Sequence, residues 1–276
     1  MVRIITDSAA DFEPLEISLL DIETIPLTVS FGNVHYKENV NLTKRIFYNL
    51  LTMQDSHPKT SLPSPKLIED TFSKIPPNDQ IVGIFLSSHL SGTYQSVKYF
   101  SKNRKNCYII DSHSASAGER ILVEEAVKMR NQGKCGSEIF NRLENLKHKI
   151  KLYACIDNIE FLQKGGRISS SKARIGSVAN IKPVITMEDG KVVVAHKSIG
   201  MKRGMNYIIK RLNHNKPDLK YPFHIMYTHV HHQGVVMKES LMEAGYNINN
   251  HSLINAGAVI GSHIGTNSCG IAYVSK

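Results

Sequence analysis

The side chains best suited to chemistry are the hydroxyls of the segment LSSHLSGTYQS, at residues 86–96. This segment follows the apolar run IVGIF and surrounds Gly92 with four serines and a threonine. The hydroxyls fit three roles: a serine nucleophile with its helpers, a cradle for an anion, or a helix cap. We expect Ser91 to cap a helix that begins at Gly92. Because a helix N-terminus also offers free N–H groups to a carboxylate or phosphate, capping and anion binding are compatible.

A catalytic serine has little support in this segment. A nucleophile elbow reads G-x-S-x-G, whereas SHLSG has a serine in the first position. A serine nucleophile also needs a base and an orienting acid, and the sequence does not place His89, His113 or His263 beside it. Neither GxxxxGK[ST] nor GxGxxG, the phosphate-loop patterns, follows the strand. An acyl hydrolase or transferase that uses Ser91 with His263 remains the alternative function.

Further hydroxyl-rich segments follow the other expected strands. TDSAAD at residues 6–11 and DSHSAS at 111–116 each come directly after an apolar run, as the segment at 86–93 does. In open parallel sheets, ligands bind beyond the carboxyl ends of the strands, so these segments are expected to meet. PKTSLPSP presents Thr60 and Ser61 on a loop stiffened by prolines, although alone it is typical of a turn.

Candidate metal ligands are few. Asp7 and Asp11 have no third ligand in their segment, and THVHHQG at residues 228–234 lacks the spacing that zinc requires. We expect surface histidines at a strand end there, and no metal or cofactor. His263, in the glycine-rich stretch AGAVIGSHIG, differs because glycines permit close backbone approach and a histidine can donate to an anion.

Composition places the chain among ordinary soluble proteins. It has 276 residues, long enough for two domains, with 41% hydrophobic and 21% charged residues. No apolar run approaches the roughly 20 residues of a membrane span, and MVRIITDSAAD lacks a signal-peptide pattern, so we expect a cytoplasmic protein without stable membrane insertion. The four cysteines are far apart and form no CxxC, so they are expected to be reduced.

The net charge of +10 raises the question of a nucleic-acid partner. Basic residues form only short clusters, KNRK at 102–105 and KHKIK at 147–151, and are otherwise scattered. The sequence contains neither an RNA-recognition signature nor a zinc-finger spacing. We expect no nucleic-acid binding; the basic surface also suits an anionic ligand, an acidic protein or a membrane surface.

Strand and helix patterns alternate in the first half of the chain. Strands are expected at 2–6, 22–31, 81–86 and 107–111, and helices at 43–53, 65–74, from 92 onward and at 114–131. Thr43 and Ser64 are expected helix caps, and residues 55–66 have a loop composition. Because the links are short, the economical fold is a parallel sheet covered by helices on both faces.

The pattern changes after a helix near residues 136–149. Strands are expected at 151–156, 223–228, 251–261 and 269–274, helices at 203–212 and 234–244, and a hairpin at 182–198. The hairpin turns at Asp189-Gly190. Hairpins mixed with helices predict an α+β domain with a mixed sheet. We therefore expect two domains, at residues 1–150 and 151–276.

These segments together resemble the DegV family over essentially the whole chain. The motifs that carry the resemblance are ITDSAAD (5–11), KTSLPSP (59–65), LSSHLSGTYQS (86–96), DSHSASAGE (111–119), DNIEFLQKGGRIS (157–169), IKPVI with MEDGKV (181–192) and GAVIGSHIG (257–265). The resemblance implies a two-domain α/β protein, without catalytic residues, that binds one long-chain fatty acid between its domains. It also implies a partner kinase that phosphorylates the presented carboxylate with ATP and so feeds phospholipid synthesis.

Site residues follow from matching the family motifs position by position. The expected carboxylate-binding residues are Thr60, Ser61, Ser88, Ser91, Gly92 and His263. Arg167 resembles a basic residue near the pocket mouth, where it would meet the kinase or its phosphate. The chain departs from the family at Leu62, where glutamine is usual, at Thr266-Asn267, and at Ile199, where the family has an arginine; the last departure bears on kinase docking more than on lipid binding.

The physical chemistry of a fatty acid fits such a site. Burial of an acyl chain contributes about 0.8 kcal/mol per methylene, so a sixteen-carbon tail supplies about 12 kcal/mol before association costs. Each hydrogen bond to the charged head adds about 1.5–3 kcal/mol. The tail would supply affinity, and the hydroxyls would fix position.

Overall fold

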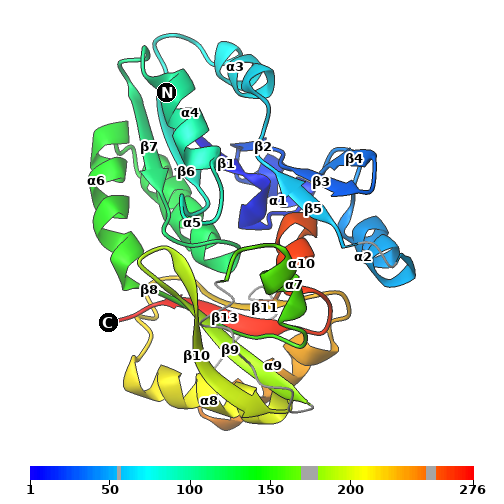
Figure 1. Ribbon diagram of the computed structural model, residues 1–276. Helices are drawn as coiled ribbons and strands as arrows, with labels where there is room; N and C mark the ends of the chain where they lie inside the picture. The colour runs from blue at the N-terminus through cyan, green and yellow to red at the C-terminus, as the bar shows by residue number, and fades with distance from the viewer. Residues whose placement is uncertain (55–56, 169–179, 247–252) are drawn as a thin grey trace.

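The chain folds around one parallel sheet in its N-terminal part (Figure 1). The computed structural model describes residues 1–54, 57–168, 180–246 and 253–276. The strand order of the parallel sheet is β2 (Ile22–Ile25), β1 (Val2–Asp7), β6 (Gln80–Phe85) and β7 (Cys107–Asp111). The continuous apolar runs of β1 and β6 are typical of strands buried on both faces.

Helices cover both faces of the parallel sheet. α5 (Ala117–Asn131) and α6 (Gly136–Leu146) pack on one face, where Ile4 and Val82 point. α3 (Pro65–Ser73) and α4 (Thr93–Ser101) pack on the other, against Ile5 and Ile81. Alternate residues of each strand thus enter opposite cores, as the strand period of two requires.

A six-stranded mixed sheet forms the C-terminal part. Its order is β10 (Lys191–Ile199), β9 (Ile181–Glu188), β8 (Ile150–Cys155), β13 (Cys269–Val274), β11 (Phe223–Tyr227) and β12 (Leu253–Asn255). α8 (Met201–His214) and α9 (His232–Glu243) cover one face. The other face turns toward α5 and the N-terminal part (Figure 1). The expected α/β fold, with a parallel sheet followed by a mixed sheet, is confirmed.

A small antiparallel sheet lies beside these two layers. Its order is β4 (Val34–Lys37), β3 (Thr28–Phe31) and β5 (Lys59–Ser61). α2 (Lys44–Met53) and α10 (Ala258–Ile264) pack against it, so a C-terminal helix joins N-terminal elements. The shorter elements are η1 (Ser8–Ala10), α1 (Pro14–Leu19), η2 (Lys147–Lys149) and α7 (Glu160–Lys164).

Three expectations about elements are wrong. The strand predicted at 22–31 is two strands, β2 and β3, in different sheets, with Pro26 between them. Part of the loop predicted at 55–66 is the strand β5. Of the strand predicted at 251–261, residues 251–252 lie outside the described residues, 253–255 form β12, and α10 follows. β5 and α10 both matter for the site, since they carry Thr60 and His263.

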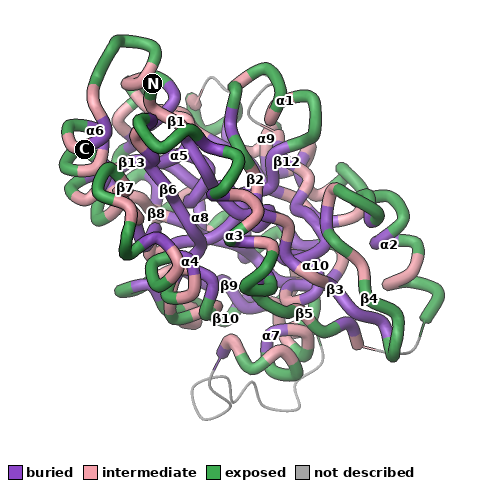
Figure 2. Tube along the Cα trace, turned by 90° about the horizontal axis from the view of Figure 1, so that it is seen from above, coloured by how far each residue is buried: buried purple, intermediate pink, exposed green. Residues whose placement is uncertain are grey.

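Burial is continuous from the parallel sheet to the mixed sheet (Figure 2). One hydrophobic cluster joins Ile4 and Val82 of the parallel sheet, through α5, to Leu152 and Ala272 of the mixed sheet. Over the described ranges, none of the helices has the length and apolar character needed to cross a bilayer.

Candidate binding site

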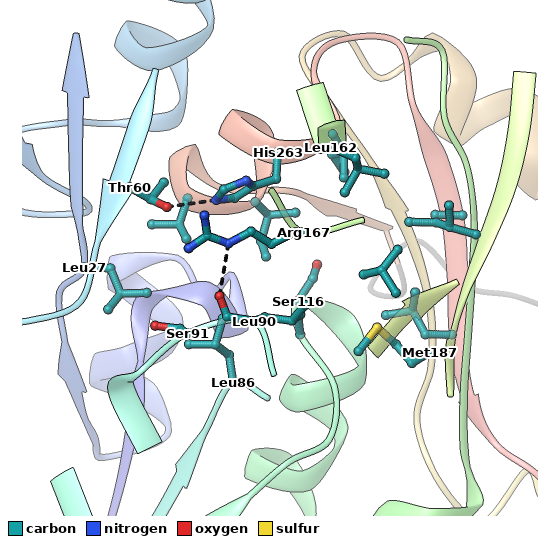
Figure 3. A pocket seen from close by; sticks show the side chains of 18 of the residues that line it. Leu27, Thr60, Leu86, Leu90, Ser91, Ser116, Leu162, Arg167, Met187 and His263 are labelled. Atoms are coloured by element: carbon teal, nitrogen blue, oxygen red, sulfur yellow. Dashed lines mark hydrogen bonds between the residues drawn. The ribbon is translucent and has the colours of Figure 1, made fainter. Parts of the chain in front are cut away.

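An apolar cavity of about 280 Å³ lies between the two large sheets (Figure 3). Its walls are aliphatic side chains and methionines from the mixed sheet, from α7 and α10, and from the segments that follow β2, β5, β6 and β7. They are Leu27, Leu62, Leu86, Leu90, Ala115, Leu152, Ala154, Leu162, Ile185, Met187, Val192, Met226, Val259, Ile260 and Ile264. A volume just below the 300–1,000 Å³ typical of small-molecule pockets, with so few polar groups, suits a slender apolar ligand.

Thr60 and His263 form a polar group in this apolar lining. Thr60 Oγ1, on β5, lies 2.8 Å from Nε2 of His263, on α10 (Figure 3). Burial, together with the nearby Arg167 guanidinium and His57, lowers the pKa of His263 to about 3. The imidazole is therefore neutral at neutral pH. Among the described residues, its buried Nδ1 has no hydrogen-bond partner.

Arg167 and Ser91 lie beside this pair. Arg167 Nε donates to Leu90 O at 3.1 Å, and Nη1 donates to Gly165 O. Burial of the guanidinium lowers the pKa of Arg167. A half-buried cation and a neutral imidazole at one place of an otherwise apolar cavity can attract and hold a single anionic group.

The expectation that Ser91 is the N-cap of its helix is wrong. α4 begins at Thr93 with Gly92 as N-cap, one residue later than predicted, and Ser91 Oγ accepts from the Thr93 N–H at 3.3 Å. Ser91 Oγ also pairs with Thr93 Oγ1 at 2.8 Å. Because His263 Nε2 pairs with Thr60, the serine–histidine pair of the hydrolase alternative is not formed in the structure.

The structure brings most of the predicted site residues to one cavity. Thr60, Ser61, Ser91, Gly92, Arg167 and His263 all line it. Ser88 does not; its backbone N–H donates to Asp111 Oδ1 at 3.2 Å. A role for Ser88 at the carboxylate stays a prediction. The glycine-rich motif that contains Arg167 continues into residues 169–179, which lie outside the described residues.

Ser116 is a polar lining residue that was not singled out from the sequence. It adopts φ 52° and ψ −132°, immediately before α5, and its Oγ donates to Asp11 Oδ2. The turn is tightly packed, because a Cβ on Gly118 would lie 2.0 Å from Ser114 Oγ. The signal was present in the sequence, since DSHSAS follows a strand at its carboxyl end.

The histidines of THVHHQG play no part in this cavity. β11 ends at Tyr227, so His229 and His231 follow a strand end, as expected, and His231 is exposed. The His229 ring stacks on Tyr48, with centroids 5.4 Å apart. Within residues 1–54, 57–168, 180–246 and 253–276, no three His, Cys, Asp or Glu side chains are arranged to hold a metal ion.

Gly165 leaves room for the His263 ring, and this gives a first prediction. A Cβ at Gly165 would lie 2.3 Å from His263 Nδ1, although its backbone suits any residue. Gly165→Ala should therefore displace the imidazole and weaken binding of an anionic ligand about tenfold. This corresponds to a loss of about 1.4 kcal/mol of binding free energy. Titration calorimetry with palmitate measures this change.

Gly166→Ala is the matched control for that variant. Gly166 has φ +70°, and a Cβ there meets nothing within 4 Å. The substitution should cost about 1 kcal/mol of stability through backbone strain, with ligand affinity unchanged. Equal affinities for the Gly165→Ala variant and the wild type would contradict the placement of His263 in the site.

Comparison with known proteins shows the family. The model described as an uncharacterised protein of the DegV family matches residues 1–276. The chain belongs to the DegV family. A DegV domain-containing protein of Clostridium acetobutylicum is 29% identical over 280 residues, covering 100% of this chain and 99% of its own. One of Staphylococcus aureus is 30% identical over 280 residues, covering 99% and 98%. The resemblance predicted from the motifs is confirmed.

Solved DegV structures share the whole fold. DegV of Bacillus subtilis, described as a fatty acid binding protein, matches with a TM-score of 0.84 and 26% identity, covering 100% of this chain and 99% of that one. A stearic acid-binding protein from Eubacterium ventriosum matches with a TM-score of 0.90 and 22% identity, covering 100% and 99%. The second likeness is one of fold alone.

Proposed function

We propose that this protein binds one long-chain fatty acid in the cavity between its two large sheets. The tail would lie against the aliphatic walls, and the carboxylate would meet Thr60, Ser91 and His263. The observation that carries the proposal is the cavity itself, apolar along its walls and polar at Thr60, His263 and Arg167. Relatives described as fatty acid binding proteins support it.

Neutral donors beside one half-buried cation suit a fatty-acid carboxylate. Because Nε2 of the uncharged His263 pairs with Thr60 Oγ1, this pair keeps one donor for the carboxylate, and the Ser91 hydroxyl offers a second. Since each hydrogen bond to a charged group contributes about 1.5–3 kcal/mol, these two bonds hold the head, with the Arg167 guanidinium beside them. The tail contributes about 0.8 kcal/mol per methylene and dominates the affinity.

We further propose that the protein has no chemistry of its own and offers the carboxylate to a partner kinase in the cytoplasm. In this proposal residues 1–150 and 151–276 form two domains with the lipid between them. Leu62, 45% exposed, and Arg167 lie at the cavity and would mark its mouth. Ile199, 53% exposed, stands where the family has an arginine, so kinase docking would rely on other residues.

Native mass spectrometry of the protein purified from a bacterial host tests fatty-acid binding. We expect an added mass that corresponds to one long-chain fatty acid, recovered by solvent extraction. Substitution of both Thr60 and Ser91 by alanine should lower lipid retention at least about tenfold, because two hydrogen bonds to the carboxylate are lost. A clean lipid-free mass for the wild type, with no fatty acid extracted, would exclude the function.

A fluorophosphonate probe separates binding from hydrolysis. A binding protein should neither be labelled at Ser91 nor turn over an acyl ester. Labelling that disappears in Ser91→Ala would favour the hydrolase alternative.

A further inference from the structure

Two buried carboxylates hold the backbone where α10 begins. Asp11 Oδ1 accepts from the Gly257 N–H at 2.7 Å, and Glu38 Oε1 accepts from the Val259 N–H at 3.1 Å. Both acids are buried, with 1% and 2% exposure, and they lie 246 and 221 residues away from their partners in the sequence. N-terminal side chains therefore fix the start of a C-terminal helix.

Gly257 shows how close this contact is. A Cβ there would lie 2.3 Å from Glu38 Oε1 and 2.9 Å from Asp11 Oδ1. Its φ of −75° is open to any residue, so glycine is required by the approach of the carboxylates and not by the backbone conformation.

Two side chains of α2 extend the contact toward β12. Lys44 Nζ donates to Asn255 O at 2.7 Å and to Asp11 O at 3.1 Å. The Tyr48 hydroxyl donates to Ala256 O at 2.9 Å. We call Asp11, Glu38, Lys44 and Tyr48 the α10 clamp; all four are buried.

α10 connects the clamp to the cavity. Val259, Ile260, His263 and Ile264 of this helix line the cavity. Val259 and His263 are four residues apart and so share one face of the helix. Because the helix is short and internally hydrogen-bonded, a shift of its first residues moves His263 relative to Thr60.

Asp11 also contacts another wall of the cavity. Its Oδ2 accepts from Ser116 Oγ, and Ser116 lines the cavity directly before α5. One carboxylate thus joins the wall formed by the segment before α5 to the helix that carries His263.

We propose that the α10 clamp positions the head-group site: it fixes the start of α10 so that His263 meets Thr60 and the lipid carboxylate. This inference rests on the proposed function, because the affinity that the clamp sets is the affinity for a fatty acid. Linkage requires the reverse effect as well, so a lipid carboxylate bound to His263 must stabilise the hydrogen bonds of the α10 clamp.

Palmitate affinities of clamp variants test the proposal. Asp11→Ala should weaken binding at least about tenfold, and Asp11→Asn, which keeps an acceptor for the Gly257 N–H, should restore most of the affinity. Tyr48→Phe removes one hydroxyl and keeps the ring; it should fold normally and bind about fivefold more weakly. The control is Glu119→Gln, a buried acid that accepts from Thr6 Oγ1 outside the clamp and should bind as the wild type does.

A double-mutant cycle with His263→Ala separates positioning from general support of the fold. If the clamp acts through His263, then Asp11→Ala and Tyr48→Phe should cause no further loss of affinity in the His263→Ala background. Equal losses in both backgrounds would overturn the inference. Failure of the wild type to bind palmitate would instead refute the proposed function, so the two failures are distinguishable.

Amide hydrogen exchange distinguishes a clamp that positions His263 from one that only supports the fold. Only positioning makes the effect of palmitate on α10 depend on His263. In the wild type, palmitate should slow amide exchange in a peptide that spans residues 255–264. In His263→Ala at saturating palmitate the slowing should be smaller, because only the tail contacts of Val259, Ile260 and Ile264 with α10 remain. Equal slowing in both proteins would overturn the inference.

Discussion

Ala154→Phe is expected to abolish fatty-acid binding and leave the protein folded. Ala154 lines the cavity from the middle of β8, and its partner on β13 is Gly270, which has no side chain. A phenyl ring would therefore enter space that the acyl tail needs. Exclusion of six methylenes removes about 5 kcal/mol, which weakens binding by more than about a thousandfold. Native mass spectrometry and calorimetry with palmitate measure the loss.

Cys155→Ala is the control for that variant. Cys155 is the next residue of β8 and points to the other face of the mixed sheet, into the core with α8. Removal of its sulfur should lower the thermal midpoint and leave lipid binding intact. Retention of a sixteen-carbon lipid by Ala154→Phe would show that the tail lies outside this cavity.

Local signals in the sequence predicted the elements that depend on neighbouring residues. Thr43 and Ser64 cap their helices as expected, through bonds to backbone N–H groups three residues ahead. The hairpin turns at Asp189-Gly190, where both residues have the positive φ that this dipeptide favours. Caps and tight turns need no distant partner, so a single sequence contains what determines them.

Elements that depend on distant partners were not predictable in this way. The apolar, glycine-containing run around His263 resembles a strand, yet it forms α10. Its glycines serve close packing, since a Cβ on Gly261 would lie 2.5 Å from Phe47 Cε1. The carboxylates of Asp11 and Glu38 fix its start. Only the folded chain brings these residues together.

The site was predictable in its polar part and not in its apolar part. Thr60, Ser91, Arg167 and His263 were recognised from motifs, and the structure places all four at one cavity. The aliphatic walls were not, because a leucine that lines a cavity and one that fills a core have the same pattern in the sequence.

The lipid-free protein is expected to become more stable as the pH falls from about 8 to about 6. Burial raises the pKa of Asp7 to about 7, of Asp11 to about 6 and of Glu38 to about 7. Since these pKa values lie above those of the unfolded chain, the folded state binds protons that the unfolded state lacks. The resulting stability is fully present below about pH 4 and is lost as the pH rises through the folded values.

Protonation of His263 changes the stability of the folded state in the opposite direction at lower pH. Its folded pKa of about 3 lies below the unfolded value of 6.5, so its contribution is lost as the pH falls below about 6.5. Between about pH 8 and 6 the carboxyl groups therefore determine how stability changes with pH. Each group that is protonated only in the folded state adds about 1.4 kcal/mol to the free energy of unfolding for each unit by which the pH falls. The thermal midpoint should rise by several degrees.

Thermal unfolding at constant ionic strength, with Glu119→Gln beside the wild type, checks the sign. Burial and the nearby Asp7 raise the pKa of Glu119 well above its usual range, and its Oε2 has no hydrogen-bond partner among the described residues. The glutamine variant should gain less stability on acidification than the wild type does, because it removes a group whose pKa burial raises in the folded state. Glu23→Gln, at an exposed position of β2, should keep the slope of the wild type. A midpoint that falls on acidification from pH 8 to 6 would show that the pKa values of these buried carboxyl groups are not raised in the folded protein.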